Sequence, residues 1–350
     1  MTVFRRNRVE LVCIALGSAV LVGTVAAIGV DGLARDLRLI GWGLAVILLV
    51  ESLSVLLNTG GWALAFPRGE RVVSLPWLLA ARLAGDAVNY LTPSATVGGE
   101  LLRVHLLGRK RVPGSLRWGS VSVAKVGQSV AQAVFIFLGL TLALPRLLGG
   151  SPWTGWPGLV AAAVGGSAAV AVGAAFVWMV RRGFWATLRG ALGRVRLARL
   201  LPPSWMGPGQ DLDAALARLG AWRTAASLGC FVLGWAIGAV EIYLILDWVG
   251  DTVDWQTALA VETGSVILDG MLFFVPAKVG TQEGGKVAIF AALGLSPARG
   301  LTVGVVRRIR ELVYAAVGLI ALTWLSARSS TDAKGVPASA PLGAGNPRGV

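Results

Sequence analysis

Polar side chains recur in pairs along the apolar stretches of this 350-residue chain. Asp86 recurs as Asp269, and the spacing between these two aspartates sets a fixed offset. At the same offset the chain pairs Asn58 with Glu241, Pro93 with Pro276, Glu100 with Glu283, Arg103 with Lys286, Lys125 with Arg308, and Gln128 with Glu311. Because no gap is needed to align these pairs in a chain so poor in charge, we interpret them as the mark of an internal repeat.

Anion binding is the chemistry that the repeated residues favour. Glu100 and Glu283 fall on short helices that we expect to begin inside the membrane, where a helix N-terminus presents unpaired N–H groups and a positive dipole end. The breaks before these helices are expected at Pro93, Pro276, Gly98, Gly99 and Gly280. The predicted substrate-binding residues are Arg82, Asp86, Glu100, Arg103, Lys125, Gln128, Asp269, Glu283, Lys286, Arg308 and Glu311. We predict that this set suits a lipid with an anionic headgroup or a polyprenyl phosphate.

Purely structural ion pairing is the competing interpretation of these residues. Arg82 and Asp86 are one helical turn apart, as are Glu100 and Arg103. A charge near the bilayer centre costs roughly 2.5 to 3.5 kcal/mol, so such residues need partners whatever they do. The inverted duplication of the whole set favours a site, because transporters build two gates around one site in this way.

The composition predicts a polytopic helical membrane protein. Hydrophobic residues make up 55% of the chain and charged residues 14%, and the apolar residues run in long unbroken stretches, which argues against a barrel. One histidine and two distant cysteines make a zinc site and a disulfide framework implausible, and we expect neither metal nor cofactor. The net charge of +14 is explained by cytoplasmic loops and anionic lipids better than by nucleic acid.

Six crossings and two re-entrant hairpins are predicted. The crossings are about residues 11–30, 40–66, 115–144, 158–180, 224–249 and 301–325, and the hairpins lie within 76–107 and 251–298. If each hairpin made a net crossing, the two repeats would be parallel. The basic loops then would not share one side of the membrane, so the positive-inside rule favours inverted repeats with both termini in the cytoplasm.

A single membrane domain, residues 1–326, is expected, with repeat 1 at about 40–145 and repeat 2 at about 223–326. The arginine-rich section 181–223 is predicted to contain a cytoplasmic amphipathic helix, and 327–350 to be a disordered cytoplasmic tail. Residues 31–38 are expected to be an outside loop. The first apolar run could also be a signal peptide, but its length favours a retained anchor.

Asp211 and Asp213 form an Asp-x-Asp element that resembles the metal and nucleotide-sugar site of some glycosyltransferases. An aspartate that opens a helix is also a common N-cap, and we favour that interpretation.

The segments Leu91–Arg103 and Phe274–Lys286, with Arg307, Arg308, Arg310 and Glu311 downstream, resemble the flippase-like membrane domain related to lysylphosphatidylglycerol synthases, over about residues 10 to 326. The second segment looks most like the hopanoid-biosynthesis-associated branch. The resemblance implies a bacterial inner-membrane protein that moves or presents a lipid. Lysyl-transferring members carry a large soluble domain after the membrane part, and because only a short tail follows it here we expect no aminoacyl transfer.

The leading hypothesis is therefore a non-enzymatic lipid transporter or flippase acting on an anionic phospholipid, a polyprenyl phosphate or a hopanoid. One alternative is a membrane-embedded transferase, for which Asp211 and Asp213 would be essential. Another is a non-catalytic scaffold for lipid-synthesis enzymes, and a homo-oligomer is compatible with each of the three.

Overall fold

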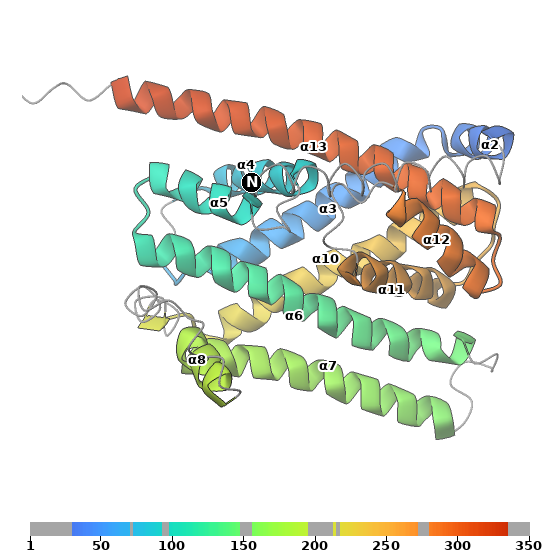
Figure 1. The fold of residues 1–350 in the computed structure, drawn as a ribbon, viewed down its shortest axis with the longest axis horizontal. Helices are drawn as coiled ribbons and strands as arrows, with labels where there is room; N and C mark the ends of the chain where they lie inside the picture. The colour runs from blue at the N-terminus through green and yellow to red at the C-terminus, as the bar shows by residue number, and fades with distance from the viewer. Residues whose placement is uncertain are drawn as a thin grey trace, which may run out of the picture.

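The computed structural model describes residues 30–70, 73–92, 98–147, 156–194, 213–214, 218–271 and 280–334, and within these residues it contains helices and no strands. Figure 1 shows long helices along the long axis of the molecule. Those long and apolar enough to cross a membrane belong to α3 (Gly43–Leu64), α6 (Gly114–Leu147), α7 (Trp156–Arg182), α10 (Ala221–Trp248) and α13 (Pro297–Lys334). The predicted all-α polytopic membrane fold is confirmed. Of the six predicted crossings, 11–30 lies outside the described residues except for Val30.

The helix order repeats. The helices α3, α4 (Leu75–Leu91), α5 (Gly98–Arg109) and α6 are followed, after α7, by the equivalent helices α10, α11 (Trp255–Met271), α12 (Thr281–Ala292) and α13. The bounds of α5 and α12 differ by the same offset that relates the repeated side chains, and so do the first residues of α6 and α13. The sequence repeat is therefore a repeat of four helices.

Equivalent helices run in opposite directions. The first residues of α10 contact the end of α3, since Arg223 Nη2 donates to Phe66 O at 3.0 Å, and Ser227 Oγ donates to Gly61 O at 2.7 Å. The end of α10 contacts the start of α3, where Trp248 packs against Gly43. In Figure 1, α6 leaves the end at which α13 finishes. The two four-helix units are thus inverted relative to each other.

Each unit contains a pair of short helices packed together, α4 with α5 and α11 with α12. A Cβ built on Gly99 would overlap the carbonyl oxygen of Gly85, so a glycine at this position allows the close approach of α4 and α5. Gly280, at the N-terminus of α12, adopts φ 72°, a conformation that glycine reaches without strain. Both positions were predicted as breaks, whereas Pro93 and Pro276 lie outside the described residues.

The segment predicted as an outside loop is a helix, α2 (Val30–Ile40). The prediction of a loop was wrong because the charges of this segment have tertiary partners. Asp36 is buried and pairs with Arg299 at 2.5 Å and with the Thr302 hydroxyl at 2.7 Å. These contacts join α2 to the start of α13 and order the segment.

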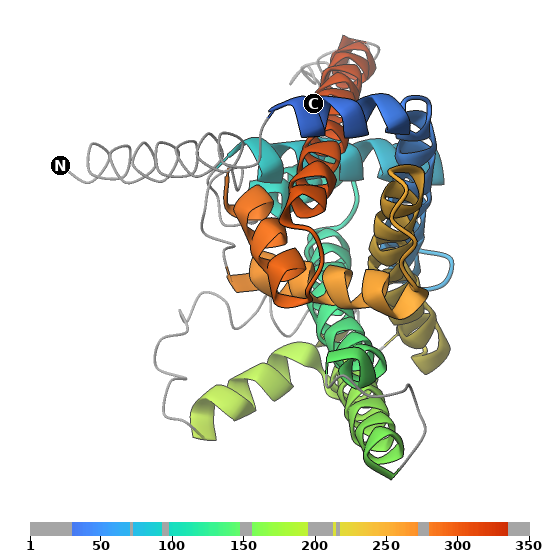
Figure 2. The same cartoon turned by 90° about the vertical axis from the view of Figure 1, so that its right-hand side faces the viewer.

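The structure describes parts of the predicted amphipathic section and of the predicted tail. The amphipathic section begins with α8 (Phe184–Arg194), which crosses the direction of α7 in Figure 2 after a turn at Gly183, φ 101°. Helix α13 continues to Lys334, so the first residues of the predicted tail are helical. The rest of the tail, and most of 195–217, lie outside the described residues.

Candidate functional site

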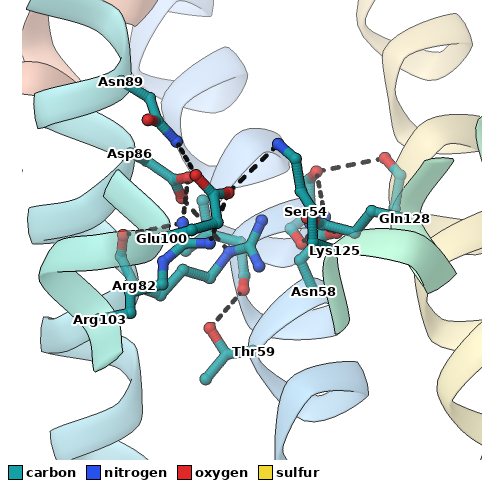
Figure 3. A network of polar contacts seen from close by, with 12 residues as sticks. Ser54, Asn58, Thr59, Arg82, Asp86, Asn89, Glu100, Arg103, Lys125 and Gln128 are labelled. Carbon is teal, nitrogen blue, oxygen red and sulfur yellow. Dashed lines mark hydrogen bonds and ion pairs between the residues drawn. The ribbon is translucent and has the colours of Figure 1, made fainter. Parts of the chain in front are cut away.

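Asp86 lies at the centre of a cluster of charges between α4, α5 and α6, shown in Figure 3. Arg82 Nε is 3.3 Å from Asp86 Oδ2, and Arg103 Nη2 is 2.5 Å from Asp86 Oδ1. The Arg82 and Arg103 side chains are almost fully buried, whereas the Asp86 side chain is 44% exposed. We call Arg82, Asp86, Glu100, Arg103 and Lys125 the first-repeat cluster. The accessible carboxylate of Asp86 therefore covers two buried guanidinium groups.

Glu100 connects α5 to α6 within the first-repeat cluster. Lys125 Nζ is 3.2 Å from Glu100 Oε1, and Arg103 Nη1 is 3.4 Å from the same oxygen. Asn89 Nδ2 donates to Glu100 Oε2 at 3.1 Å, and Asn89 Oδ1 accepts from the Gly99 backbone N–H at 2.7 Å. An N–H group at the start of α5, predicted to bind an anion, is therefore capped by Asn89 in this conformation. Asn89 was missed because it has no counterpart in the repeat.

Gln128 lies beside the first-repeat cluster on α6. Its Nε2 donates to Asn58 Oδ1 on α3 at 3.0 Å. Asn58 in turn donates to the Ser54 carbonyl at 2.9 Å. Gln128 therefore reaches the cavity described below through Asn58.

The second repeat reproduces one contact of the first. Arg308 Nε is 2.8 Å from Glu283 Oε1, which matches Lys125 with Glu100 at the repeated positions. Arg308 Nη1 also lies 3.6 Å from Glu311 Oε2 and donates to the Tyr90 hydroxyl at 2.7 Å. Glu283, Arg308 and Glu311 form the second-repeat cluster, and Tyr90 connects it to α4.

Lys286 and Asp269 do not reproduce the contact of Arg103 with Asp86. Lys286 is 2% exposed, and no carboxylate of the described residues lies within 4.0 Å of its Nζ. Asp269 accepts from Gln282 Nε2 at 3.4 Å. The two repeats therefore differ in that the buried cation of the first is ion-paired and the buried cation of the second has no ion pair among the described residues.

A third group of charges was not predicted as a site. We call Glu51, Glu241, Glu262, Arg307 and Arg310 the five-charge cluster. Arg307 lies 2.6 Å from Glu262 Oε2 and 3.2 Å from Glu241 Oε2. Arg310 pairs with Glu241 and lies 3.0 Å from Glu51 Oε2. These contacts join α3, α10, α11 and α13 deep inside the bundle.

The repeat explains why Glu51 and Arg310 of the five-charge cluster escaped prediction. At the offset between the repeats, Glu51 matches Gly234 and Arg310 matches Gly127, so a search for repeated polar residues passes over them. A different sequence signal could have found them. A charged residue within an apolar helix needs an ion-pair partner inside the protein, so every such residue is a candidate for a buried cluster.

A cavity of about 270 Å³ opens between α3, α4 and α13, and so between the two repeats. Its polar lining is Glu51, Ser54, Asn58, Arg82, Asp86, Tyr90, Arg310, Glu311 and Tyr314. Of the predicted site residues, Arg82, Asp86 and Glu311 line it directly. Glu100, Arg103, Lys125, Gln128, Glu283 and Arg308 reach it through one or two polar contacts. Asp269 and Lys286 are not among the lining residues. Glu100 and Glu283 therefore do not face each other directly across the cavity.

Comparison with known proteins gives one match, to the family model described as the lysylphosphatidylglycerol synthase TM region, over residues 11–318. The chain belongs to this family. No curated protein and no solved structure matches it. As a chain of the lysylphosphatidylglycerol synthase TM region family, it is a multi-pass membrane protein, and the match covers the clusters, the cavity and both repeats except for the end of α13.

Among the described residues, no group of three His, Cys, Asp or Glu side chains could bind a metal. Asp213 Oδ2 accepts from the Ala186 backbone N–H at 2.8 Å, at the start of α8. Asp213 thus caps the N-terminus of α8. Asp211 lies outside the described residues.

Proposed function

We propose that this protein is a lipid transporter of the flippase type, which moves or presents an anionic or isoprenoid-type lipid through the cavity between its inverted repeats. The observation that carries the proposal is the lining of that cavity. Arg82 and Asp86 come from the first repeat, and Arg310 and Glu311 come from the second. A site shared in this way opens to one side or the other when one repeat moves against its partner.

The two guanidinium groups are the binding groups of the proposal. Arg82 is paired with Asp86, and Arg310 with Glu51 and Glu241. A phosphate offers the oxygen geometry that a guanidinium binds in a bidentate manner, so a headgroup would replace Asp86 and Glu51 by exchange of ion pairs. Such an exchange keeps both guanidinium groups ion-paired throughout, which lowers the barrier to entry and release.

The paired short helices of each repeat are the elements that we propose to move when one repeat shifts against the other. At about 1.5 Å per residue, a 17-residue helix such as α4 is about 26 Å long and the 12-residue α5 about 18 Å, so neither crosses a ~30 Å hydrocarbon layer comfortably. We propose that α4 with α5, and α11 with α12, are re-entrant pairs that enter from opposite sides. Irregular backbone is tolerated at that depth only where it is enclosed by protein or lines a wet cavity.

The charges at the ends of the bundle support an orientation. Exposed basic residues gather where α5, α7 and α8 end, and they include Arg109, Lys110, Arg111, Arg182 and Arg194. The opposite end, where α10 finishes, carries acidic and basic residues in balance, with Asp31, Asp36, Asp251 and Asp254 beside Arg35, Arg38 and Arg299. By the positive-inside rule the basic end lies in the cytoplasm, and the membrane is the bacterial inner membrane that the resemblance implies.

Anionic phospholipids, polyprenyl phosphate and hopanoid lipids remain the candidate substrates, and the hopanoid-associated branch remains an interpretation of the sequence segment Phe274–Lys286. The proposal does not use Asp213, which caps the N-terminus of α8. We therefore propose transport without covalent chemistry.

Transport in proteoliposomes tests the proposal. Fluorescent phosphatidylglycerol and fluorescent polyprenyl phosphate are the probes, and an impermeant quencher reports the fraction that reaches the outer leaflet. The variant Arg82→Gln/Arg310→Gln should lose transport of the accepted probe. Arg299→Gln is the matched control, because Arg299 is also ion-paired but lies at the other end of α13, away from the cavity. Normal transport by the double variant would reject the site.

A further inference from the structure

A second groove lies on the outside of the bundle. It has a volume of about 810 Å³ and runs between α7 and α10. Its lining is Val170, Gly173, Ala174, Val177, Trp178, Arg181 and Arg182 from α7, with Ala225 and Leu228 from α10. It shares no lining residue with the cavity between the repeats.

The groove has the length of one acyl chain. Val170 and Arg182 bound its lining on α7, and at 1.5 Å per residue this segment is about 18 Å long. Half of a ~30 Å hydrocarbon layer is about 15 Å. The groove begins at the arginines, where α7 ends at the basic end of the bundle (Figure 1), and extends to about the bilayer centre.

The end of the groove carries two arginines that have no ion pair among the described residues. Arg181 and Arg182 are exposed, and no carboxylate of the described residues lies within 4.0 Å of either guanidinium. The Arg182 guanidinium lies 5.4 Å from the centroid of the Trp178 ring. Arginine with tryptophan is the combination typical of the depth of lipid headgroups. A phosphate at this place would accept charge-assisted hydrogen bonds from both arginines.

Small residues keep the groove open. A Cβ on Gly173 would lie 3.3 Å from Leu228 Cδ2, so a larger side chain there would occupy the space between the helices. Ala174, one position further, is exposed to the groove. The rest of the lining is apolar up to the two arginines, which matches an acyl chain followed by an anionic headgroup.

We propose that the groove between α7 and α10 binds one anionic phospholipid from the leaflet at the basic end, with its phosphate on Arg181 and Arg182 and an acyl chain along Gly173 and Ala174. The lipid would connect α7, which links the two repeats in sequence, to the first helix of the second repeat. This site is separate from the transport cavity, so it does not depend on the transport proposal.

Native mass spectrometry of the detergent-purified protein tests the groove. The probes are phosphatidylglycerol and phosphatidylcholine with identical acyl chains. The wild type should retain one phosphatidylglycerol with a preference of roughly tenfold over phosphatidylcholine, given the electrostatic gain typical of basic residues near anionic lipid. Arg181→Gln/Arg182→Gln should lose the preference. Ala174→Leu should lower the retention of both lipids by filling the groove.

Two matched variants serve as controls. Arg68→Gln/Arg111→Gln removes two exposed arginines elsewhere at the same end, and Ala175→Leu enlarges an exposed residue of α7 outside the groove. Both should bind lipid as the wild type does, and soluble glycerol phosphate should not displace the lipid. Equal retention of the two lipids by the wild type would overturn the proposal. So would an unchanged preference in Arg181→Gln/Arg182→Gln, or a dimer that Ala174→Leu converts to a monomer.

Discussion

The hydroxyl of Tyr90 on α4 accepts a hydrogen bond from Arg308 on α13 at 2.7 Å, which joins the two repeats beside the cavity. The same guanidinium pairs with Glu283 on α12. Arg308 therefore bridges α12 of its own repeat to α4 of the first repeat. If the repeats move relative to each other to open the cavity, this contact must break.

Tyr90→Phe should loosen the junction between the repeats. A hydrogen bond to a charged group contributes about 1.5 to 3 kcal/mol, so its loss shifts the population toward conformations in which the cavity is open. The measurement is the rate at which a water-soluble maleimide modifies Ser54→Cys, a cavity position, after Cys13 and Cys230 are replaced by serine. The rate should rise in Tyr90→Phe and stay constant in the control Tyr243→Phe. Unchanged labelling in both would show that the contact does not restrain the repeats.

Gly99→Ala should destabilise the first hairpin. The added Cβ would overlap Gly85 O, a backbone atom that cannot turn away, and overpacking of this kind costs about 1 to 3 kcal/mol. The control is Gly60→Ala, where no atom lies within 4 Å of the built Cβ and alanine improves helix propensity by up to about 1 kcal/mol. Thermal unfolding in detergent should show a lower midpoint for Gly99→Ala only. Equal midpoints would mean that α4 and α5 are not in this contact.

Arg310→Gln should be among the most destabilising changes of a single charge. It leaves Glu51 without its partner and Glu241 with only Arg307, and the loss of one partner from a buried pair costs about 3 to 5 kcal/mol. The second change Glu51→Gln should restore part of the loss, because it removes the carboxylate left unpaired. Thermal midpoints of the two single variants and the double variant form the test. Additive losses would contradict the pairing.

The inversion of the repeats can be checked at two equivalent places. Ser115 lies at the start of α6 and Ser296 immediately before α13, at opposite ends of the bundle. In intact cells a membrane-impermeant maleimide should modify Ser296→Cys and spare Ser115→Cys, with both native cysteines replaced. In permeabilised cells the reagent should modify both introduced cysteines. Modification of both sites in intact cells would mean that they share one side.

Much of the fold was predictable because apolar length and repeat spacing are properties of the sequence. The start of α6 and the bounds of α5 were close to the prediction, since glycine, proline and charge mark them. Helix α2 was missed because its order depends on Asp36 meeting Arg299, which is distant in the chain. An ion pair between residues that are distant in the chain leaves no pattern in the sequence around either residue.

The site was predictable mainly where it is duplicated, and Arg82 is the exception, because Ser265 stands at its equivalent position. Asp86 and Glu311 were found through the repeat, and both line the cavity. Glu51 and Arg310 line it as well but have glycine at the equivalent positions. The repeat therefore identifies the shared framework of the site and omits the charges by which the two halves differ.

Reversible cross-linking across the cavity tests the central claim most directly. Ala87 on α4 and Ala315 on α13 both line the cavity, one from each repeat. In a cysteine-free background, Ala87→Cys/Ala315→Cys joined by a short cleavable bifunctional reagent should stop lipid transport in proteoliposomes, and reductant should restore it. Each single variant, treated in the same way, should transport normally. Transport by the cross-linked protein at the rate of the reduced protein would contradict a mechanism in which the two inverted repeats move against each other around this cavity.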